Sequence, residues 1–149
     1  MHADHVLRTE RTLPYAAHHI YEAFKAAPVL ASWWGPEGFT NTFDVFEFTP
    51  GGRWVFTMHG PDGKNYLNTS RFEVLEPDTR VVICHDCAPH FTLTIALAPV
   101  PGGTHLTWHQ AFDDAATARA VQSIAGPANE QNLDRLTRAL VAANTPRAS

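Results

Sequence analysis

The chain has 149 residues, of which 44% are apolar and 17% are charged, and this length and composition predict one globular domain with a single core. Its 11 basic and 15 acidic side chains form no Lys/Arg run, which argues against nucleic acid as a partner. No apolar window reaches the roughly 18 residues of a membrane span, and the first residues are too polar for a secretory signal. We therefore expect a cytoplasmic protein without a membrane span, and the closely spaced Cys84 and Cys87 fit a reducing compartment.

The first part of the chain predicts one strand followed by two short helices. β-Branched and long apolar residues recur from His5 to Leu13, which is typical of a strand, and Pro14 ends it. Apolar residues at three- and four-residue spacing then predict a helix from Ala17 to Ala27. A second short helix is expected from Pro28 to Trp34.

Residues 40–110 change to segments of strand length that are separated by short turns rich in Pro, Gly and Asp. Turns of this length join antiparallel neighbours, whereas parallel strands need longer crossovers. The pattern therefore predicts an antiparallel meander. Its six strands are expected at Asn41 to Phe48, Arg53 to His59, Tyr66 to Glu76, Arg80 to Asp86, His90 to Ala98 and Thr104 to Gln110.

The C-terminal part is predicted to be helical in two pieces. Asp113 and Asp114 can cap a helix that runs through Ala125, and Gly126-Pro127 is expected to start a new helix that reaches about Ala143. The apolar side of this last helix should dock on the sheet, and its charged side should face solvent. We assign Leu133, Leu136, Leu140 and Val141 to the docked side, and Asp134, Arg135 and Arg138 to the other side.

Together these elements predict a single α+β domain over residues 1–149, with an ordered core of about 6–143. A curved seven-stranded antiparallel sheet wraps around a long C-terminal helix, and two short helices lie between the first and second strands. This arrangement leaves a cleft between sheet and helix.

The order of elements, together with the motifs WWGP, FTPGGRW, TMHGPDG, PHFTLTIAL and NEQNLDRL, resembles the SRPBCC or START-like superfamily. Within it the chain is similar to the bacterial AHSA-type proteins, homologues of the activator of the heat-shock-ninety ATPase. The resemblance spans roughly Val6 to Val141 and implies the helix-grip fold, often with an internal pocket. Relatives bind lipids and hydrophobic molecules, cyclise polyketides, sequester antibiotics or assist chaperones, so the fold alone leaves the function open.

Side-chain alternation along the strands predicts an apolar cleft with a few polar groups. Trp54 and Phe56 should face inward, and such a stripe is equally typical of a plain core that the last helix covers. Tyr66, Asn68 and Gln110 favour a ligand, because buried amides and hydroxyls need partners. The predicted ligand-binding residues are Trp33, Trp54, Phe56, Met58, Tyr66, Asn68, Phe72, Phe91, Leu93, Trp108, Gln110, Asn132 and Leu136.

The Trp33-Trp34 pair is expected to anchor the second short helix to the sheet as a hydrophobic plug. The alternative is a gate at the mouth of the cleft, with one ring inside and the other on the surface.

Chemically active residues are harder to place. His59, His85 and Tyr66 are weak candidates for acid–base catalysis, because imidazole titrates near neutral pH, but no catalytic motif contains them. The run from Cys84 to Cys87 contains zinc-ligand types, yet a structural zinc site needs four rigidly held ligands. We therefore predict no metal and no cofactor.

The leading functional prediction is a small-molecule binding protein whose cleft accepts a lipid-like or aromatic metabolite. One alternative is a cyclase- or hydrolase-type enzyme that uses a pocket His or Tyr as general acid or base, so the question of enzymatic activity is left open. The other is a chaperone ATPase accessory protein, the weakest of the three because the further N-terminal domain of the eukaryotic activators is not expected here. A homodimer is an open alternative for the assembly.

Overall fold

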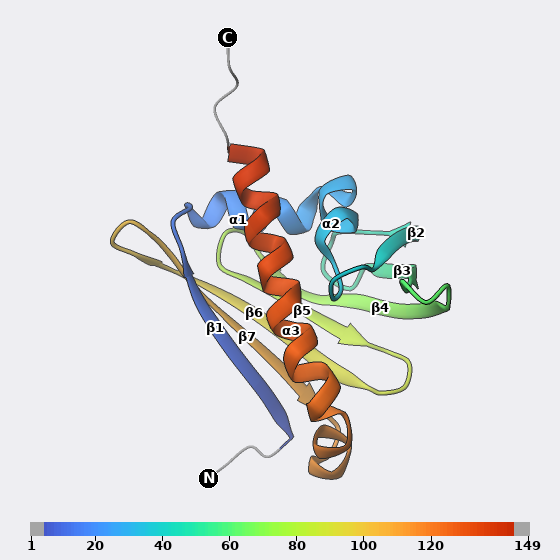
Figure 1. The fold of residues 1–149 in the computed structure, drawn as a ribbon. Coiled ribbons are helices and arrows are strands. Elements are labelled where there is room, and N and C mark those ends of the chain that lie inside the picture. Colours follow the sequence, from blue (N-terminus) through green and yellow to red (C-terminus); the bar gives the residue numbers. More distant parts are fainter. Residues whose placement is uncertain (1–4, 145–149) are drawn as a thin grey trace.

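The computed structural model describes residues 5–144 and contains one seven-stranded antiparallel sheet in the order β1-β7-β6-β5-β4-β3-β2 (Figure 1). Strands β2 to β7 follow one another as a meander, and β1 pairs with β7, with Val6 opposite Ala111 and Leu13 opposite Thr104. Residues 1–4 and 145–149, at the two termini beyond the expected ordered core, lie outside the described residues. The strands are β1 (Val6–Leu13), β2 (Thr40–Phe46), β3 (Arg53–His59), β4 (Asn65–Glu76), β5 (Arg80–His85), β6 (Phe91–Val100) and β7 (Gly103–Phe112).

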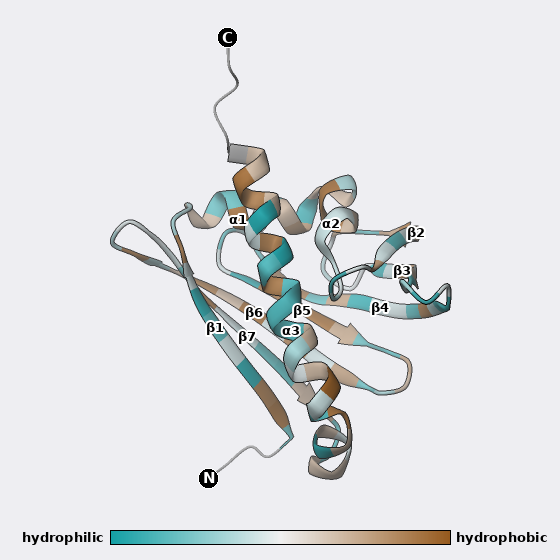
Figure 2. Ribbon diagram, viewed as in Figure 1, coloured by the Kyte–Doolittle hydropathy of each residue, from teal (hydrophilic) through white to brown (hydrophobic). Residues whose placement is uncertain are grey.

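Three helices complete the fold. The two short ones, α1 (Ala17–Lys25) and α2 (Ala27–Trp33), connect β1 to β2, and the long α3 (Ala115–Asn144) lies across one face of the sheet (Figure 1). Much of the α3 surface turned away from the sheet is hydrophilic, as an amphipathic helix requires (Figure 2). The α+β helix-grip architecture predicted from the sequence is confirmed. No helix among residues 5–144 is both long and apolar enough to cross a lipid bilayer.

Helix α3 is one helix, so the predicted break at Gly126-Pro127 is wrong. Proline removes a backbone donor and normally crowds the Cβ of the residue before it, which favours a helix end. Gly126 has no Cβ, and this absence relieves the crowding. The helix therefore continues through Pro127, and its first turns run in a different direction from the rest (Figure 1).

The side-chain assignment on α3 needs two corrections. Leu133, Leu136 and Leu140 are buried against the sheet as predicted, but Val141 is half exposed. Arg135 was assigned to the solvent side, and its side chain is only 11% exposed. The guanidinium lies over the segment that follows α2, where it binds backbone carbonyls.

One strand changes the face that it presents to the core. The pairing of β4 with β5 shifts between Phe72 and Val74, which marks a β-bulge. A bulge adds one residue and reverses the alternation beyond it. Leu75 therefore packs against the core, in place of Val74, which simple alternation assigns to that face.

Aromatic rings make up much of the core between the sheet and the helices. The Trp54 ring stacks on Phe72 with centroids 5.5 Å apart and on Phe56 at 4.3 Å. Trp33 meets Phe24 edge to face at 5.0 Å. These rings are fully or almost fully buried, which makes this part of the domain a rigid support for the neighbouring cavity.

Candidate ligand-binding site

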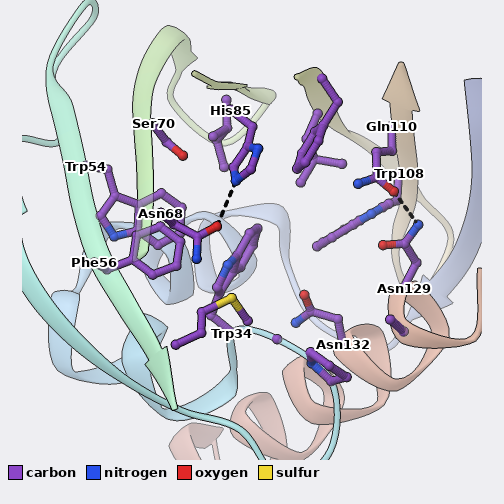
Figure 3. Close-up of a pocket in the computed structure, with 17 residues that line it drawn as sticks. Trp34, Trp54, Phe56, Asn68, Ser70, His85, Trp108, Gln110, Asn129 and Asn132 are labelled. Carbon is purple, nitrogen blue, oxygen red and sulfur yellow. Dashed lines mark hydrogen bonds between the residues drawn. The ribbon is translucent and has the colours of Figure 1, made fainter. Parts of the chain in front are cut away.

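A cavity of about 230 Å³ lies between the sheet and α3 (Figure 3). We call it the inner cavity. Five strands contribute alternate residues to its wall, because side chains that are two apart point to the same face of a strand. The lining residues are Trp34, Gly35 and Pro36 after α2; Trp54, Phe56 and Met58 on β3; Asn68 and Ser70 on β4; Ile83 and His85 on β5; Phe91 and Leu93 on β6; Trp108 and Gln110 on β7; and Ala128, Asn129 and Asn132 on α3.

Trp34 occupies the centre of the aromatic wall (Figure 3). Its ring lies 5.0 Å from that of Trp54 and 5.8 Å from that of Trp108, measured between centroids. Trp34 meets Trp54 edge to face at an interplanar angle of 65° and is tilted by 33° against Trp108, so the three rings form a continuous but angled apolar surface. The cavity thus combines a large apolar wall with a few polar atoms, the usual composition of a small-molecule site.

The loop that carries Trp34 is held by side chains from outside the loop. Arg135 on α3 donates from Nη1 to the carbonyl oxygens of Trp34, Gly35 and Pro36 at 2.9–3.0 Å, and from Nη2 to those of Ser32 and Phe39. These carbonyls follow a helix end, where backbone acceptors lack helical partners. Burial lowers the pKa of Arg135, although nearby Glu37 opposes that shift.

Two asparagines complete this support. Asn41 donates to the carbonyls of Ala31 and Trp34 at 3.0 and 2.9 Å. Asn132 donates through Nδ2 to the Trp33 carbonyl at 3.0 Å and turns its other amide atom toward the cavity (Figure 3). The last carbonyls of α2 are thus satisfied by side chains, and the position of Trp34 is tied to α3.

His85 is the ionisable side chain on the cavity wall. Its Nδ1 lies 2.9 Å from the Pro89 carbonyl, its Nε2 lies 2.7 Å from Asn68 Oδ1, and its ring stacks on Phe91 with centroids 4.4 Å apart. Burial lowers the pKa of His85, His90 adds to that shift, and hydrogen bonds to Pro89 and Cys87 oppose it. Both ring nitrogens face oxygens that can only accept, so the neutral imidazole, which has one proton, donates to only one of them. The carbonyl of Pro89 covers Nδ1, and the amide of Asn68 covers Nε2.

Of the two cysteines, only Cys87 lies next to the His85 ring. Its Sγ lies 3.4 Å from His85 Nε2 and 4.0 Å from Nδ1, and such similar distances place it above the ring rather than in the ring plane in line with Nε2. Cys84 points to the opposite face of β5, where it donates to Glu73 at 3.2 Å. Within residues 5–144, no three His, Cys, Asp or Glu side chains are grouped to hold a metal ion.

A second hollow of about 670 Å³ continues from the inner cavity toward solvent, and we call it the outer vestibule. It shares Pro36, Met58, Asn68 and His85 with the inner cavity. The exposed side chains of Tyr66, Leu67 and Ile124 also line it. The inner cavity and the outer vestibule therefore adjoin at these four residues.

Most of the residues predicted to bind a ligand line the inner cavity. They are Trp54, Phe56, Met58, Asn68, Phe91, Leu93, Trp108, Gln110 and Asn132, together with His85 from the acid–base candidates. Trp33, Phe72 and Leu136 are buried in the core outside it. Tyr66 lines only the vestibule, because β4 there extends beyond the cover of α3. His59 binds Thr42 and Asn65 on the other face of the sheet.

Several residues of the site were not anticipated as ligand-binding residues. Trp34 takes the place expected for Trp33, whose Nε1 donates to the Ala23 carbonyl at 3.0 Å inside the core. Ser70 shares the β4 face with Asn68, so strand alternation alone could have added it. Arg135 and Asn41 act through the backbone of a loop, and no periodic pattern marks that role.

Comparison with known proteins identifies the family of this chain. The family model described as Activator of Hsp90 ATPase homolog 1-like protein matches residues 14–141. The chain belongs to this family. Among solved structures, it is similar to an AHSA1-like protein from Aeromonas hydrophila, with 22% identity and a TM-score of 0.76 over 97% of each chain. No protein with curated annotation matches it.

Two crystal structures of proteins from other bacteria are also similar to this AHSA1-like chain. A protein from Nitrosomonas europaea has a TM-score of 0.89 with 17% identity, over 98% of this chain and 100% of that one. A protein from Rhodobacter sphaeroides has a TM-score of 0.82 with 25% identity, over 93% of both chains. These similarities establish a shared fold, whereas function must be argued from the site.

Proposed function

We propose that this protein binds a hydrophobic or aromatic small molecule in the inner cavity. The observation that carries the proposal is an unfilled space of about 230 Å³ whose wall combines aromatic rings with buried polar side chains. Cores are normally packed to the density of organic crystals, so a space of this size beside the core offers room for a small molecule. The outer vestibule supplies an apolar route for entry.

Thermal-shift and native mass spectrometry with lipids and aromatic compounds test this proposal. A ligand present at about 100 times its Kd adds about 2.7 kcal/mol of stability, which raises Tm by about 5–10 °C for a domain of this size. We expect such a shift together with a one-to-one complex. A compound set that gives neither would overturn the proposal.

Ala128→Phe provides the matched control. Ala128 lines the cavity from α3, and a phenyl ring at that position fills the space from a helical backbone that tolerates the larger side chain. The variant should fold and fail to respond to ligands that stabilise the wild-type protein. Equal Tm shifts in both proteins would mean that binding occurs elsewhere.

An acid–base enzyme is the second candidate, and the position of His85 on the cavity wall favours it. A base must lie within hydrogen-bond reach of the proton that it removes. Asn68 covers Nε2 at 2.7 Å, so a substrate would have to displace that amide. Turnover that is lost in His85→Gln while ligand binding persists would support this candidate.

The name of the matched family suggests a third candidate, an accessory to a chaperone ATPase. A docking surface for that role would include Leu67 and Ile124, the exposed apolar side chains at the vestibule. An unchanged chaperone ATPase rate at a protein concentration of about 10 μM would count against this candidate, because transient partners typically bind in the micromolar range.

A further inference from the structure

The polar atoms of the inner cavity form two groups on opposite sides of the aromatic wall (Figure 3). Ser70 on β4 belongs to the first group, beside Asn68 and His85. Gln110 on β7 and Asn132 on α3 belong to the second group. Three of these side chains come from buried residues, with Ser70 and Asn132 each 5% exposed and Gln110 9% exposed.

Hydrogen bonds within the protein use only part of this polar capacity. Gln110 accepts a hydrogen bond from Asn129 at 3.0 Å, which leaves its Nε2 amide group as a donor. Asn132 donates to Trp33, which leaves its carbonyl oxygen as an acceptor. The Ser70 hydroxyl has no hydrogen-bond partner among the described residues. None of these three atoms is among the fully buried, unpartnered side-chain atoms of residues 5–144, so they reach the cavity surface, where each group can bind a polar atom of a ligand.

The charge of the site limits what can enter it. None of the described residues that line the inner cavity is Asp, Glu, Lys or Arg. Arg135 lies behind the loop and uses its guanidinium on five backbone carbonyls. His85 is the one ionisable side chain among these lining residues, and burial lowers its pKa and so favours the neutral form. A carboxylate, phosphate or ammonium group buried here would meet no Lys, Arg, Asp or Glu, which is strongly unfavourable.

The size of the space limits the ligand further. A dry cavity of about 150 Å³ accepts benzene, so about 230 Å³ suits two fused rings. The Trp34 and Trp108 rings are tilted by 33° to each other, and each offers an aromatic surface to such rings.

We propose that the inner cavity selects an uncharged two-ring aromatic compound with a hydroxyl or carbonyl group at each end. One end binds Ser70, and the other binds Gln110 and Asn132. This inference rests on the proposed function and narrows it, because it excludes fatty acids and other charged lipids from the inner cavity.

Isothermal titration of the full chain with four related probes tests the inference. They are 2,6-dihydroxynaphthalene, 2-naphthol, naphthalene and 6-hydroxy-2-naphthoate, which differ only in their polar ends. We expect the diol to bind at least tenfold more tightly than naphthalene, with 2-naphthol between them. The naphthoate should bind at least tenfold more weakly than the diol, because its carboxylate would be buried in a cavity that no Lys or Arg lines.

Two variants assign the ends. Ser70→Ala and Gln110→Leu should each weaken binding of the diol about to the level of 2-naphthol and leave naphthalene binding unchanged. Thr69→Ala is the matched control, since Thr69 is the neighbour of Ser70 on the opposite face of β4, and it should change none of the affinities. The probe series on the wild-type protein decides the question even if a variant does not fold.

The outcomes separate this inference from the proposed function. If naphthalene or the naphthoate binds as tightly as the diol, the inference is overturned and the proposed function stands. The inference is also overturned, and the proposed function stands, if none of the four probes binds while another hydrophobic compound occupies the cavity. If no compound binds in the wild-type cavity, both are overturned.

Discussion

Arg135 Nη1 donates to the Trp34 carbonyl oxygen at 3.0 Å, a contact between residues 101 apart in the sequence. The same guanidinium binds four further carbonyls of the segment from Ser32 to Phe39. Because Trp34 is the centre of the cavity wall, α3 sets the shape of the inner cavity through this loop as well as through its own side chains.

Replacing Arg135 with methionine should lower the free energy of unfolding by about 2–4 kcal/mol, because five carbonyls, four of them in partly buried hydrogen bonds, lose a charged donor together. The loop that carries Trp34 should also loosen, so the affinity for 2-naphthol should fall by more than about fivefold. Urea unfolding and isothermal titration measure the two effects.

Arg138→Met is the control for that variant. Arg138 lies on the same helix and binds Glu37 at 2.6 Å, but its side chain is 60% exposed, and ion pairs on the surface contribute little to stability. This variant should unfold at nearly the wild-type urea concentration. Equal losses for the two variants would show that the carbonyl contacts of Arg135 are unimportant.

The two neighbouring tryptophans should separate stability from binding. Trp33→Leu removes a buried ring and its bond to Ala23, which should lower stability by about 2–4 kcal/mol while changing the affinity for 2-naphthol less than twofold. Trp34→Leu should weaken that binding at least fivefold. The assignment fails if folded Trp33→Leu protein loses affinity as much as Trp34→Leu does.

Strand alternation predicted most of the cavity wall. The inward positions of Trp54, Phe56, Leu93 and Trp108 follow from the two-residue period of a strand, which holds wherever the ladder is regular. It was misleading beyond the bulge in β4, where Leu75 replaced Val74, because nothing local in the sequence marks the extra residue.

The remaining features depend on contacts between distant residues. The sequence pair Trp33-Trp34 contains no indication of which ring enters the cavity, because that depends on how α2 ends against α3. The helical pattern places Arg135 on the solvent side. Burial of its guanidinium is favourable only because five backbone carbonyls of the segment after α2 lie opposite it. Helix α3 likewise continues through Pro127 because the preceding residue is Gly126, although a Gly-Pro pair usually indicates a break.

The depressed pKa of His85 predicts a specific pH dependence of stability. The unfolded protein binds this proton near pH 6.5, the usual value for histidine, whereas the folded protein binds it only at lower pH. Stability due to this residue is therefore complete above about pH 6.5 and is lost as the pH falls toward the folded pKa.

Urea unfolding at pH 7.5 and 5.5 measures the effect against His85→Asn. The wild-type protein should lose more stability over this range than the variant, because the other histidines contribute to both. Parallel losses would indicate that His85 has an ordinary pKa in the folded protein.

A double-mutant cycle tests the explanation for the continuous helix. With Pro127 present, Gly126→Ala should lower stability, because the new Cβ crowds the proline ring. In a Pro127→Ala background, the same change should raise stability by about 0.5–1 kcal/mol, the usual gain from glycine to alanine within a helix. The same sign of effect in both backgrounds would contradict this account. Urea unfolding of the four proteins gives the four free energies.

The most direct test of ligand binding is a titration with 2-naphthol that follows the four indole N–H signals in a nitrogen–proton NMR spectrum. Trp34, Trp54 and Trp108 line the inner cavity, whereas the Trp33 N–H points to Ala23 in the core. We predict saturable shifts of the first three signals, a much smaller shift of the Trp33 signal, and none of these changes in Ala128→Phe. Unchanged signals for the three cavity tryptophans, or the same shifts in Ala128→Phe, would contradict the proposal that the cavity binds a small molecule.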